Sequence, residues 1–178
     1  MKKYSFILLL FCAVASSLQS LSQKPATGVS KTGTTEFPRY PKAKGWINDF
    51  EGLLTKNQVR FLDSLMAVHQ QKTTNQMCLV TAPASYYPKD SLVEYSRSLF
   101  NKWGVGTREK NNGVGILLSK QNRQIRINIG YGLEQVLTNR KCQEIIDDYI
   151  LPLFKQGKYY EGIKNGITEI IRCLNESY

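Results

Sequence analysis

The sequence predicts an α/β fold: an α/β/α sandwich in which helices cover a small mixed β-sheet. Over residues 46–178, short strand-like runs alternate with longer segments whose apolar residues recur at helical spacing. The order strand, helix, strand, helix, hairpin, helix, helix leads to a mixed sheet with helices on its faces. The composition is that of a folded chain, because 42% of the residues are hydrophobic and 11% aromatic, which excludes global disorder. A length of 178 residues fits one domain.

The first half of the domain is expected to contain two strands and two helices. Residues 46–50 form a short extended segment, and Thr55 caps a helix whose apolar positions repeat every three or four residues. His69 lies on or near the buried stripe of this helix, so we expect a hydrogen-bonded core or boundary histidine rather than a catalytic one. Residues 76–82 predict a buried strand, and Asp90 is the expected cap of the second helix.

The second half is expected to add a hairpin and two helices. Residues 113–119 and 124–129 are predicted strands joined by a short turn, and the second strand alternates isoleucine with polar residues. Thr138 is expected to open a helix that stops at Pro152. A last helix is predicted over residues 158–174.

The N-terminus predicts an export signal. Residues 1–22 contain two lysines, an apolar stretch and small residues before Gln23, as a secretory signal peptide does. The apolar stretch is shorter than a membrane anchor requires, and Phe11 is a poor residue before an acylated Cys12. The protein is therefore expected to be exported, periplasmic or secreted, with no transmembrane helix in the mature chain.

A basic tether is expected to follow the signal. Residues 23–45 are rich in Pro, Gly, Thr and Lys, a composition typical of flexible linkers, so the folded domain should span residues 46–178. The formal net charge is +10 at pH 7, and half of the basic excess of the mature chain lies in this tether. The diffuse charge of the remainder argues against a nucleic-acid partner. A basic tail suits an anionic surface or an envelope polymer.

Three cysteines remain after cleavage of the signal. Cys78 lies in an apolar run and is predicted to be a small buried hydrophobic residue. Cys142 and Cys173 fall on predicted helices, where the geometry of a disulfide is demanding. The sequence leaves open whether they are bridged.

No motif of a known catalytic site stands out. Gly130-x-Gly132 begins as a dinucleotide fingerprint would, but Gln135 stands where the third glycine is required, so we reject that interpretation. The sequence has no P-loop and no G-x-S-x-G, C-x-x-C or H-E-x-x-H motif. A single histidine excludes a His-rich zinc site.

Two polar, glycine-containing loops leave strand ends, where open sheets place ligands: residues 104–113 and 130–139. The candidate oxygen ligands on or near them are Asp49, Asn111, Glu134 and Asn139. Hard oxygen donors on loops suit Ca²⁺ or Mg²⁺. The alternative is that Asn and Gly serve as turn residues, and the spacing alone favours this alternative.

Several short motifs together resemble the TPM-domain family. They include Asp49-Phe-Glu-Gly-Leu-Leu-Thr55, Trp103-Gly-Val-Gly106, Asn112-Gly-Val114, Arg123-x-x-Arg126-Ile127 and Gly130-Tyr-Gly-Leu-Glu134. The resemblance covers residues 46–174, and the family includes thylakoid-lumen proteins of photosystem II repair and exported bacterial envelope proteins. It implies an α/β/α sandwich with a small sheet, Ca²⁺ binding by loops at one sheet edge in some members, and acid phosphatase activity in some plant members.

Two positions depart from the family pattern. Asn111 and Asn139 stand where family sequences often have Asp. An amide keeps one oxygen ligand but loses the charge, so we expect any Ca²⁺ site to be weak, and Mg²⁺ is a less expected ion.

Two functions follow from the residues and the resemblance. The first is an exported module of the cell envelope that binds a protein or envelope partner and carries a weak cation site on its loops. The alternative is a divalent-cation-dependent, acid phosphatase-like phosphomonoesterase, in which the ion polarises the phosphate and Arg123 or Arg126 contacts it. The two amides in place of carboxylates favour the binding module.

Overall fold

The computed structural model describes Phe37 and residues 39–176. These residues belong to one compact unit, Thr35–Tyr178. The predicted signal peptide, residues 1–22, lies outside the described residues, as does the predicted tether up to residue 36.

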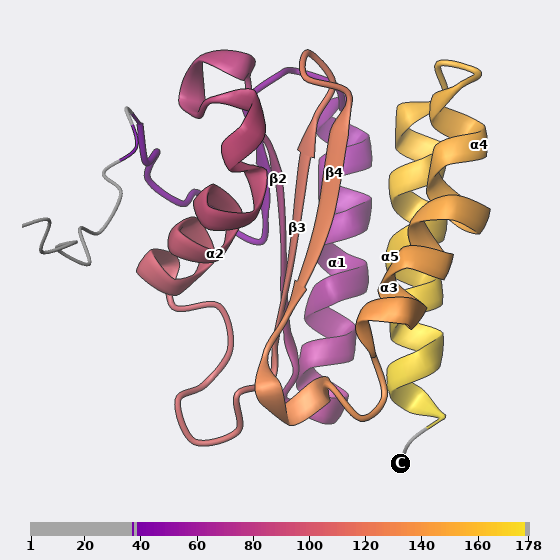
Figure 1. Ribbon diagram of the computed structural model, residues 1–178. Helices are drawn as coiled ribbons and strands as arrows, with labels where there is room; N and C mark the ends of the chain where they lie inside the picture. Colours follow the sequence, from indigo (N-terminus) through magenta and orange to yellow (C-terminus); the bar gives the residue numbers. More distant parts are fainter. Residues whose placement is uncertain (1–36, 38, 177–178) are drawn as a thin grey trace, which may run out of the picture. The chain divides into compact units, whose positions relative to one another are not determined.

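In the described residues, four strands form one sheet in the order β1-β2-β3-β4. They are β1 (Ile47–Asp49), β2 (Gln76–Thr81), β3 (Gly113–Ser119) and β4 (Gln124–Ile129). β1 and β3 run parallel to β2, whereas β4 is antiparallel to β3. The two ends of the strands therefore differ. The hairpin end holds the carboxyl ends of β1 to β3 and the turn 120–123, and the loop end holds the loops 104–112 and 130–138 (Figure 1).

Helices cover both faces of the sheet. They are α1 (Lys56–Thr73), α2 (Leu92–Trp103), α3 (Asn139–Ile145), α4 (Leu151–Phe154) and α5 (Tyr159–Asn175). Figure 1 shows α2 on one face and α1, α3 and α5 on the other. This arrangement confirms the predicted α/β/α sandwich with a small mixed sheet.

Successive residues of the central strands supply two hydrophobic cores, because their side chains alternate between the faces. Leu79 of β2 and Ile116 of β3 belong to the core that includes residues of α1, α3 and α5. Val80 and Leu117 belong to the other core, with Tyr95 of α2. β3 is buried along its whole length, as expected for a strand covered on both faces.

Two of the three predicted helix caps are confirmed. The hydroxyl of Thr55 accepts from the backbone N–H of Gln58, whose side chain accepts in return from the N–H of Thr55, so that a complete capping box opens α1. The hydroxyl of Thr138 accepts from a backbone N–H of α3. The expected cap at Asp90 is wrong, since a 3₁₀ turn, Lys89–Ser91, precedes α2 and makes Ser91 the cap residue.

The predicted helix stop at Pro152 is also wrong. The helix that Thr138 opens continues through a π-helical turn, Ile146–Ile150, into α4. Pro152 lies in the first turn of α4, where its missing N–H and fixed φ are tolerated. The π turn ends two residues before Pro152, so that the proline stands at the start of α4 and not inside a regular α-helix.

His69 is a core residue, as predicted. Its side chain is only 3% exposed, and its Nε2 lies 3.2 Å from the hydroxyl of Thr73. Burial lowers the pKa of His69, which favours the neutral ring inside the core.

The packed domain begins upstream of the boundary predicted at residue 46. Phe37 is 7% exposed, and its ring meets Tyr95 of α2 edge-on with 5.2 Å between centroids. Tyr40 stacks on the same ring at 5.6 Å, and Trp103 Nε1 donates to the carbonyl of Pro41 at 3.0 Å. This end of the predicted tether therefore lies against α2.

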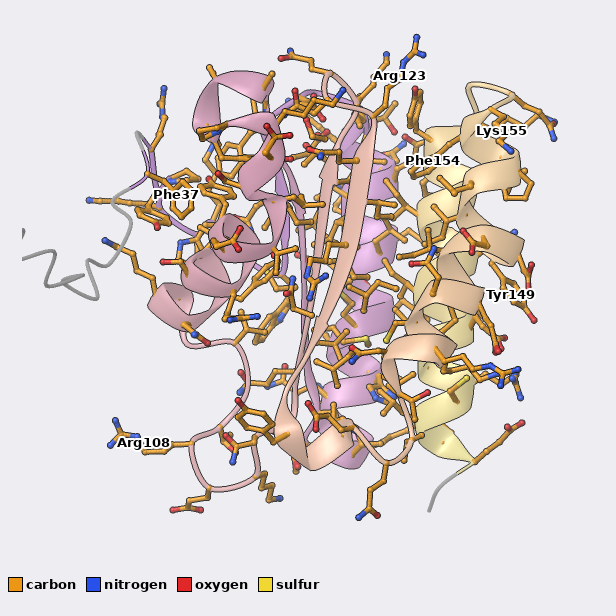
Figure 2. The ribbon with its side chains drawn as sticks, viewed as in Figure 1. Phe37, Arg108, Arg123, Tyr149, Phe154 and Lys155 are labelled. Atoms are coloured by element: carbon orange, nitrogen blue, oxygen red, sulfur yellow. The ribbon has the colours of Figure 1, made fainter. Side chains whose placement is uncertain are left out.

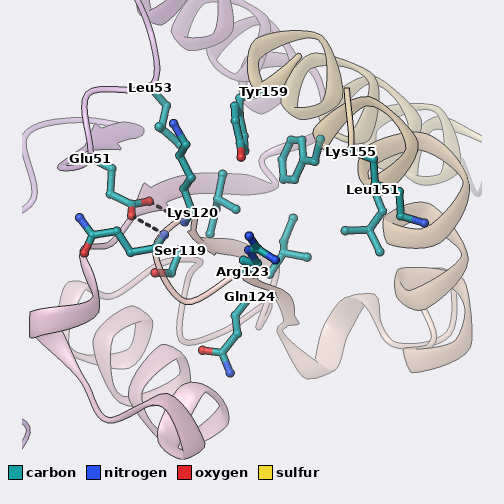
Figure 3. Close-up of a pocket in the computed structure, with 13 residues that line it drawn as sticks. Glu51, Leu53, Ser119, Lys120, Arg123, Gln124, Leu151, Lys155 and Tyr159 are labelled. Atoms are coloured by element: carbon teal, nitrogen blue, oxygen red, sulfur yellow. Dashed lines mark hydrogen bonds between the residues drawn. The ribbon is translucent and has the colours of Figure 1, made fainter. Parts of the chain in front are cut away.

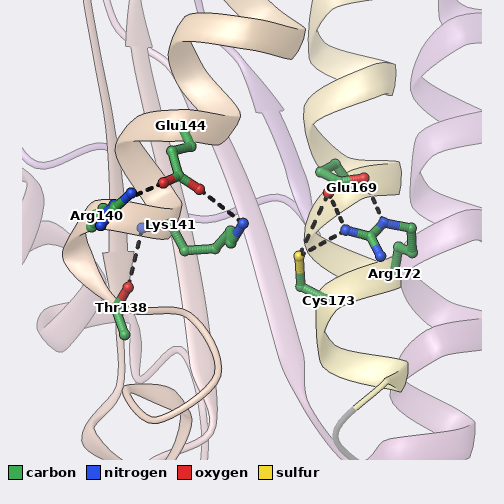
Figure 4. A network of polar contacts seen from close by, with 7 residues as sticks. All are labelled: Thr138, Arg140, Lys141, Glu144, Glu169, Arg172 and Cys173. Carbon is green, nitrogen blue, oxygen red and sulfur yellow. Dashed lines mark hydrogen bonds and ion pairs between the residues drawn. The ribbon is translucent and has the colours of Figure 1, made fainter.

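The described cysteines are buried free thiols, so Cys142 and Cys173 are not bridged. Cys173 interacts instead with Glu169 one turn earlier on α5, and Glu169 pairs with Arg172 at 2.6 Å (Figure 4). Hydrogen bonding from the Arg172 guanidinium lowers the pKa of Glu169. Glu144 of α3 pairs in the same way with two basic residues of its own helix.

Candidate functional site

Three of the four predicted cation ligands lie together in a groove at the loop end. The groove has a volume of about 960 Å³, and Asn111, Glu134 and Asn139 all line it. Arg126, one of the two predicted phosphate contacts, lines it as well. The other, Arg123, belongs to the turn 120–123, and Figure 2 shows it at the end of the sheet opposite Arg108 of the groove.

Asp49 is not part of this groove. It pairs with Thr81 at the carboxyl end of β2, whereas β3 begins beside Gln76 at the other end of that strand. Five residues of strand separate these two positions, about 16 Å. The predicted four-ligand cation site therefore does not assemble, because β1 and β2 are parallel and carry Asp49 to the hairpin end.

The Asp49 carboxylate is instead occupied in shaping the chain after β1. Its two oxygens accept from the backbone N–H groups of Leu53, at 3.1 Å, and Leu54, at 2.8 Å. The hydroxyl of Thr81 donates to it at 2.5 Å. These three donors give Asp49 a structural role in the turn that leads into α1.

The backbones of the loops 104–112 and 130–138 lie very close together beside the groove. The N–H of Gly130 donates to the carbonyl of Gly113 at 2.8 Å, and the N–H of Gly132 donates to Asn111 at 3.0 Å. Asn111 itself has a positive φ of 47°, a conformation that Asn tolerates better than most residues. Part of the glycine and asparagine content of these loops is thus explained by backbone geometry.

The neighbouring Asn112 anchors the loop and is not a ligand. It is 3% exposed, its Nδ2 donates to the carbonyl of Thr74 at 2.8 Å, and its Oδ1 accepts from the N–H of Thr107 at 2.9 Å. The amide of Asn112 therefore ties this loop to Thr74 at the end of α1.

Positive charge outweighs negative charge along the groove. Its lining contains the guanidinium groups of Arg97, Arg108 and Arg126, and the single carboxylate is that of Glu134. No ion pair joins these four side chains to one another within the described residues. The groove is therefore electrostatically suited to an anion more than to a cation.

Asn128 belongs to the same wall and orients Arg126. Its Oδ1 accepts from Arg126 Nε at 3.1 Å and from the hydroxyl of Ser96 at 3.2 Å, which fixes the orientation of the amide. Its Nδ2 is buried and has no hydrogen-bond partner among the described residues. The observed role of Asn128 is therefore to position the Arg126 side chain.

Several groove residues could not be assigned to a site from the sequence. Arg97 lies on α2, and its place in the groove depends on how that helix packs on β4. The contact of Ser96 with Asn128 marks this packing. Tyr131, 80% exposed at the groove, belongs to the Gly-Tyr-Gly motif, which was the available signal for it. Across the described chain, no three His, Cys, Asp or Glu side chains gather as a metal centre of those ligands would require.

The residues that build this sandwich match a known domain family. Residues 47–173 match the family model of the TPM domain, and the chain belongs to this family. No curated protein matches the chain. None of the helices in the described part of the chain has both the length and the apolar character needed to cross a bilayer.

Several solved structures are similar to this chain, including the following three. The N-terminal domain of a protein from P. gingivalis is 29% identical, with a TM-score of 0.67 over 74% of this chain and 83% of that one. BA42 from the psychrophilic bacterium Bizionia argentinensis is 17% identical, with a TM-score of 0.58 over 72% and 86%. The N-terminal domain of cg2496 from Corynebacterium glutamicum is 10% identical, with a TM-score of 0.52 over 79% and 88%. The last two support the fold alone.

Proposed function

We propose that this TPM domain is a binding module of the cell envelope whose groove at the loop end holds an anionic group of a protein or envelope partner. The observation that carries the proposal is the charge of the groove: three guanidinium groups face one carboxylate. Guanidinium groups bind carboxylate and phosphate oxygens through paired, charge-assisted hydrogen bonds. Export through the predicted signal, to the periplasm or outside the cell, belongs to the same proposal.

The surroundings of the arginines support recognition of a group with oxygen acceptors. The Nε of Arg126 donates to Asn128, which orients the guanidinium and leaves its terminal nitrogens as donors for a ligand. Tyr131 adds an exposed aromatic ring at the groove, and exposed aromatic and arginine side chains are common at protein interfaces.

A weak Ca²⁺ site is a secondary part of the proposal. Glu134 offers one carboxylate and Asn111 and Asn139 offer amide oxygens in the same groove, so a bound ion would complete its shell with water or with oxygens of the partner. Mg²⁺ is a poorer candidate because it requires tighter octahedral geometry. Such an ion would help to neutralise an anionic partner that the arginines also contact.

Phosphomonoester hydrolysis has less support. The groove lining includes neither histidine nor cysteine, and Glu134 is its single carboxylate. A metal-assisted hydrolase needs an activated water and a well-charged metal site, and Asp49, the second expected carboxylate, lies at the other end of the sheet.

The groove arginines are expected to dominate binding of an acidic peptide. The probe is a fluorescein-labelled peptide of ten glutamates, titrated with the full chain at low salt and followed by anisotropy. The double variant Arg97→Gln/Arg126→Gln should bind about tenfold more weakly, because two charge-assisted contacts are lost. The matched control, Lys56→Gln/Arg60→Gln, removes the same charge from exposed positions of α1 and should retain most of the affinity. Equal losses in both variants would contradict a role for the groove.

Adding carboxylates to the groove should strengthen Ca²⁺ binding and weaken binding of the acidic peptide. The double variant Asn111→Asp/Asn139→Asp is expected to bind Ca²⁺ about tenfold more tightly, since ligand charge raises affinity for a hard cation, and to bind the acidic peptide more weakly without Ca²⁺. Two-dimensional NMR during a Ca²⁺ titration measures the first effect, and anisotropy measures the second. If Ca²⁺ affinity does not change, Asn111 and Asn139 are not ligands.

A further inference from the structure

A second pocket opens at the hairpin end of the sheet, away from the groove. It has a volume of about 790 Å³ and lies between the turn 120–123 and the segment that joins α4 to α5 (Figure 3). This volume falls in the range of pockets that accept small molecules, roughly 300–1,000 Å³. None of its residues belongs to the groove of the proposed function.

The interior of this pocket is apolar and partly aromatic. The apolar lining residues are Leu53, Leu118, Ile125, Leu151, Phe154 and Tyr159. The rings of Phe154 and Tyr159 are tilted by 42° with 5.0 Å between their centroids, so they present a continuous aromatic wall. Such a surface suits an alkyl or aryl group.

The rim of the pocket carries three cations. Lys120, Arg123 and Lys155 line it, and all three are exposed. Figure 2 shows Arg123 and Lys155 at the same end of the molecule as Phe154. None of the three has an ion-pair partner among the described residues. The Lys120 ammonium lies 5.0 Å from the centre of the Tyr159 ring, which holds charge and aromatic surface side by side.

The carboxylate in the lining, Glu51, is already engaged by the backbone. Its two oxygens accept from the N–H groups of Lys120 at 2.8 Å and Gln121 at 3.1 Å (Figure 3). These bonds fix the turn and hold the Glu51 carboxylate in place, and its single negative charge is outnumbered by the three cations of the lining. The rim therefore retains a net positive charge above an apolar interior.

We propose that this pocket binds a soluble amphiphilic anion, a molecule with one phosphate or carboxylate group on an alkyl or aryl body. The apolar part would lie against Phe154 and Tyr159, and the anionic group would meet Arg123, Lys120 and Lys155 at the rim. An apolar molecule without charge leaves the cations unused, and a bare anion leaves the aromatic wall exposed. Only a ligand with both parts matches the whole pocket.

Arg123 allows a sharp test because its backbone conformation disfavours the folded state, whereas its side chain is expected to favour ligand binding. Its φ of 53° is left-handed, a conformation that glycine adopts with less strain than arginine does. Arg123→Gly should therefore stabilise the folded protein slightly while removing one cation from the rim. If Arg123 had only a structural role, the stabilised Arg123→Gly variant would bind the ligand as tightly as the wild type does.

The probe is octyl phosphate below its micelle concentration, titrated into the full chain by calorimetry and by two-dimensional NMR. We expect saturable binding, with shifts concentrated at residues 118–125 and 151–159. Arg123→Gly and Lys155→Gln should each weaken it about fivefold to tenfold. Two controls match them: Thr74→Gly relieves another positive φ, 66°, outside the pocket, and Lys72→Gln removes a charge from the end of α1. Both should bind as the wild type does.

Comparison ligands give the outcomes that would overturn the proposal. Inorganic phosphate and octyltrimethylammonium should bind far more weakly than octyl phosphate. Equal binding of the cationic amphiphile, or unchanged affinity in Arg123→Gly and Lys155→Gln, would contradict the pocket as an anion site. Binding to phosphatidylglycerol vesicles without binding of octyl phosphate would also overturn it, because these residues would then serve a membrane surface. The groove variant Arg97→Gln/Arg126→Gln should leave octyl phosphate binding unchanged, so this site and the proposed function fail separately.

Discussion

Replacing Asp49 with Ala is expected to lower the free energy of unfolding by about 3 kcal/mol. The substitution leaves the N–H groups of Leu53 and Leu54 and the hydroxyl of Thr81 without their acceptor. Thr81 is fully buried, so water cannot easily replace the lost bond, and an unsatisfied buried donor costs more than a typical hydrogen bond contributes. Urea unfolding followed by circular dichroism measures the effect.

The matched control is Asp148→Ala on the π-helical turn. Asp148 is an exposed aspartate, and its loss should change stability by no more than about 0.5 kcal/mol. If Asp49 were a cation ligand instead, Ca²⁺ would stabilise the wild type and not Asp49→Ala, and the difference between them would grow with Ca²⁺. We expect the difference to be the same with Ca²⁺ and with chelator.

Much of the fold could be predicted because its signals are local. The capping box at Thr55, the cap at Thr138 and the alternation of isoleucines in β4 each depend on residues within one turn or one strand. The predictions failed where longer-range packing decides. Pro152 does not stop its helix because a π turn precedes it, and Phe37 joins the core through Tyr95 of α2, far along the chain.

The same distinction between local signals and long-range packing explains which residues of the candidate site could be predicted. Asn111, Glu134 and Asn139 could be grouped because both loops leave the same end of the hairpin strands. Asp49 could not be placed, since only the parallel pairing of β1 with β2 decides at which end it lies. Arg97 and Asn128 line the same groove because α2 packs over β4, where Ser96 contacts Asn128. Periodicity within α2 does not reveal where the helix packs on the sheet.

The two glycines of the Gly-Tyr-Gly motif are explained by the close approach of the loops 104–112 and 130–138. A Cβ at Gly130 would lie 2.1 Å from the carbonyl oxygen of Asn111, and one at Gly132 would lie 2.0 Å from that of Lys110. Both neighbours are backbone atoms, which cannot rotate away as a side chain can. The motif, which begins as a dinucleotide fingerprint would, therefore allows the loops 104–112 and 130–138 to touch beside the groove.

Gly130→Ala is accordingly expected to destabilise the protein by about 3 kcal/mol or more and to open the groove. The methyl group forces the loops 104–112 and 130–138 apart, which breaks the bonds from Gly130 to Gly113 and from Gly132 to Asn111. Acidic-peptide binding should fall even where the variant remains folded, because the displaced loop 104–112 carries Arg108 away from Arg126. Gly45→Ala is the control, since its added Cβ meets no atom within 4 Å and stability should be nearly unchanged. Urea unfolding and peptide anisotropy on the same samples separate the two effects. A Gly130→Ala protein as stable as Gly45→Ala would mean that the loops do not need this close approach.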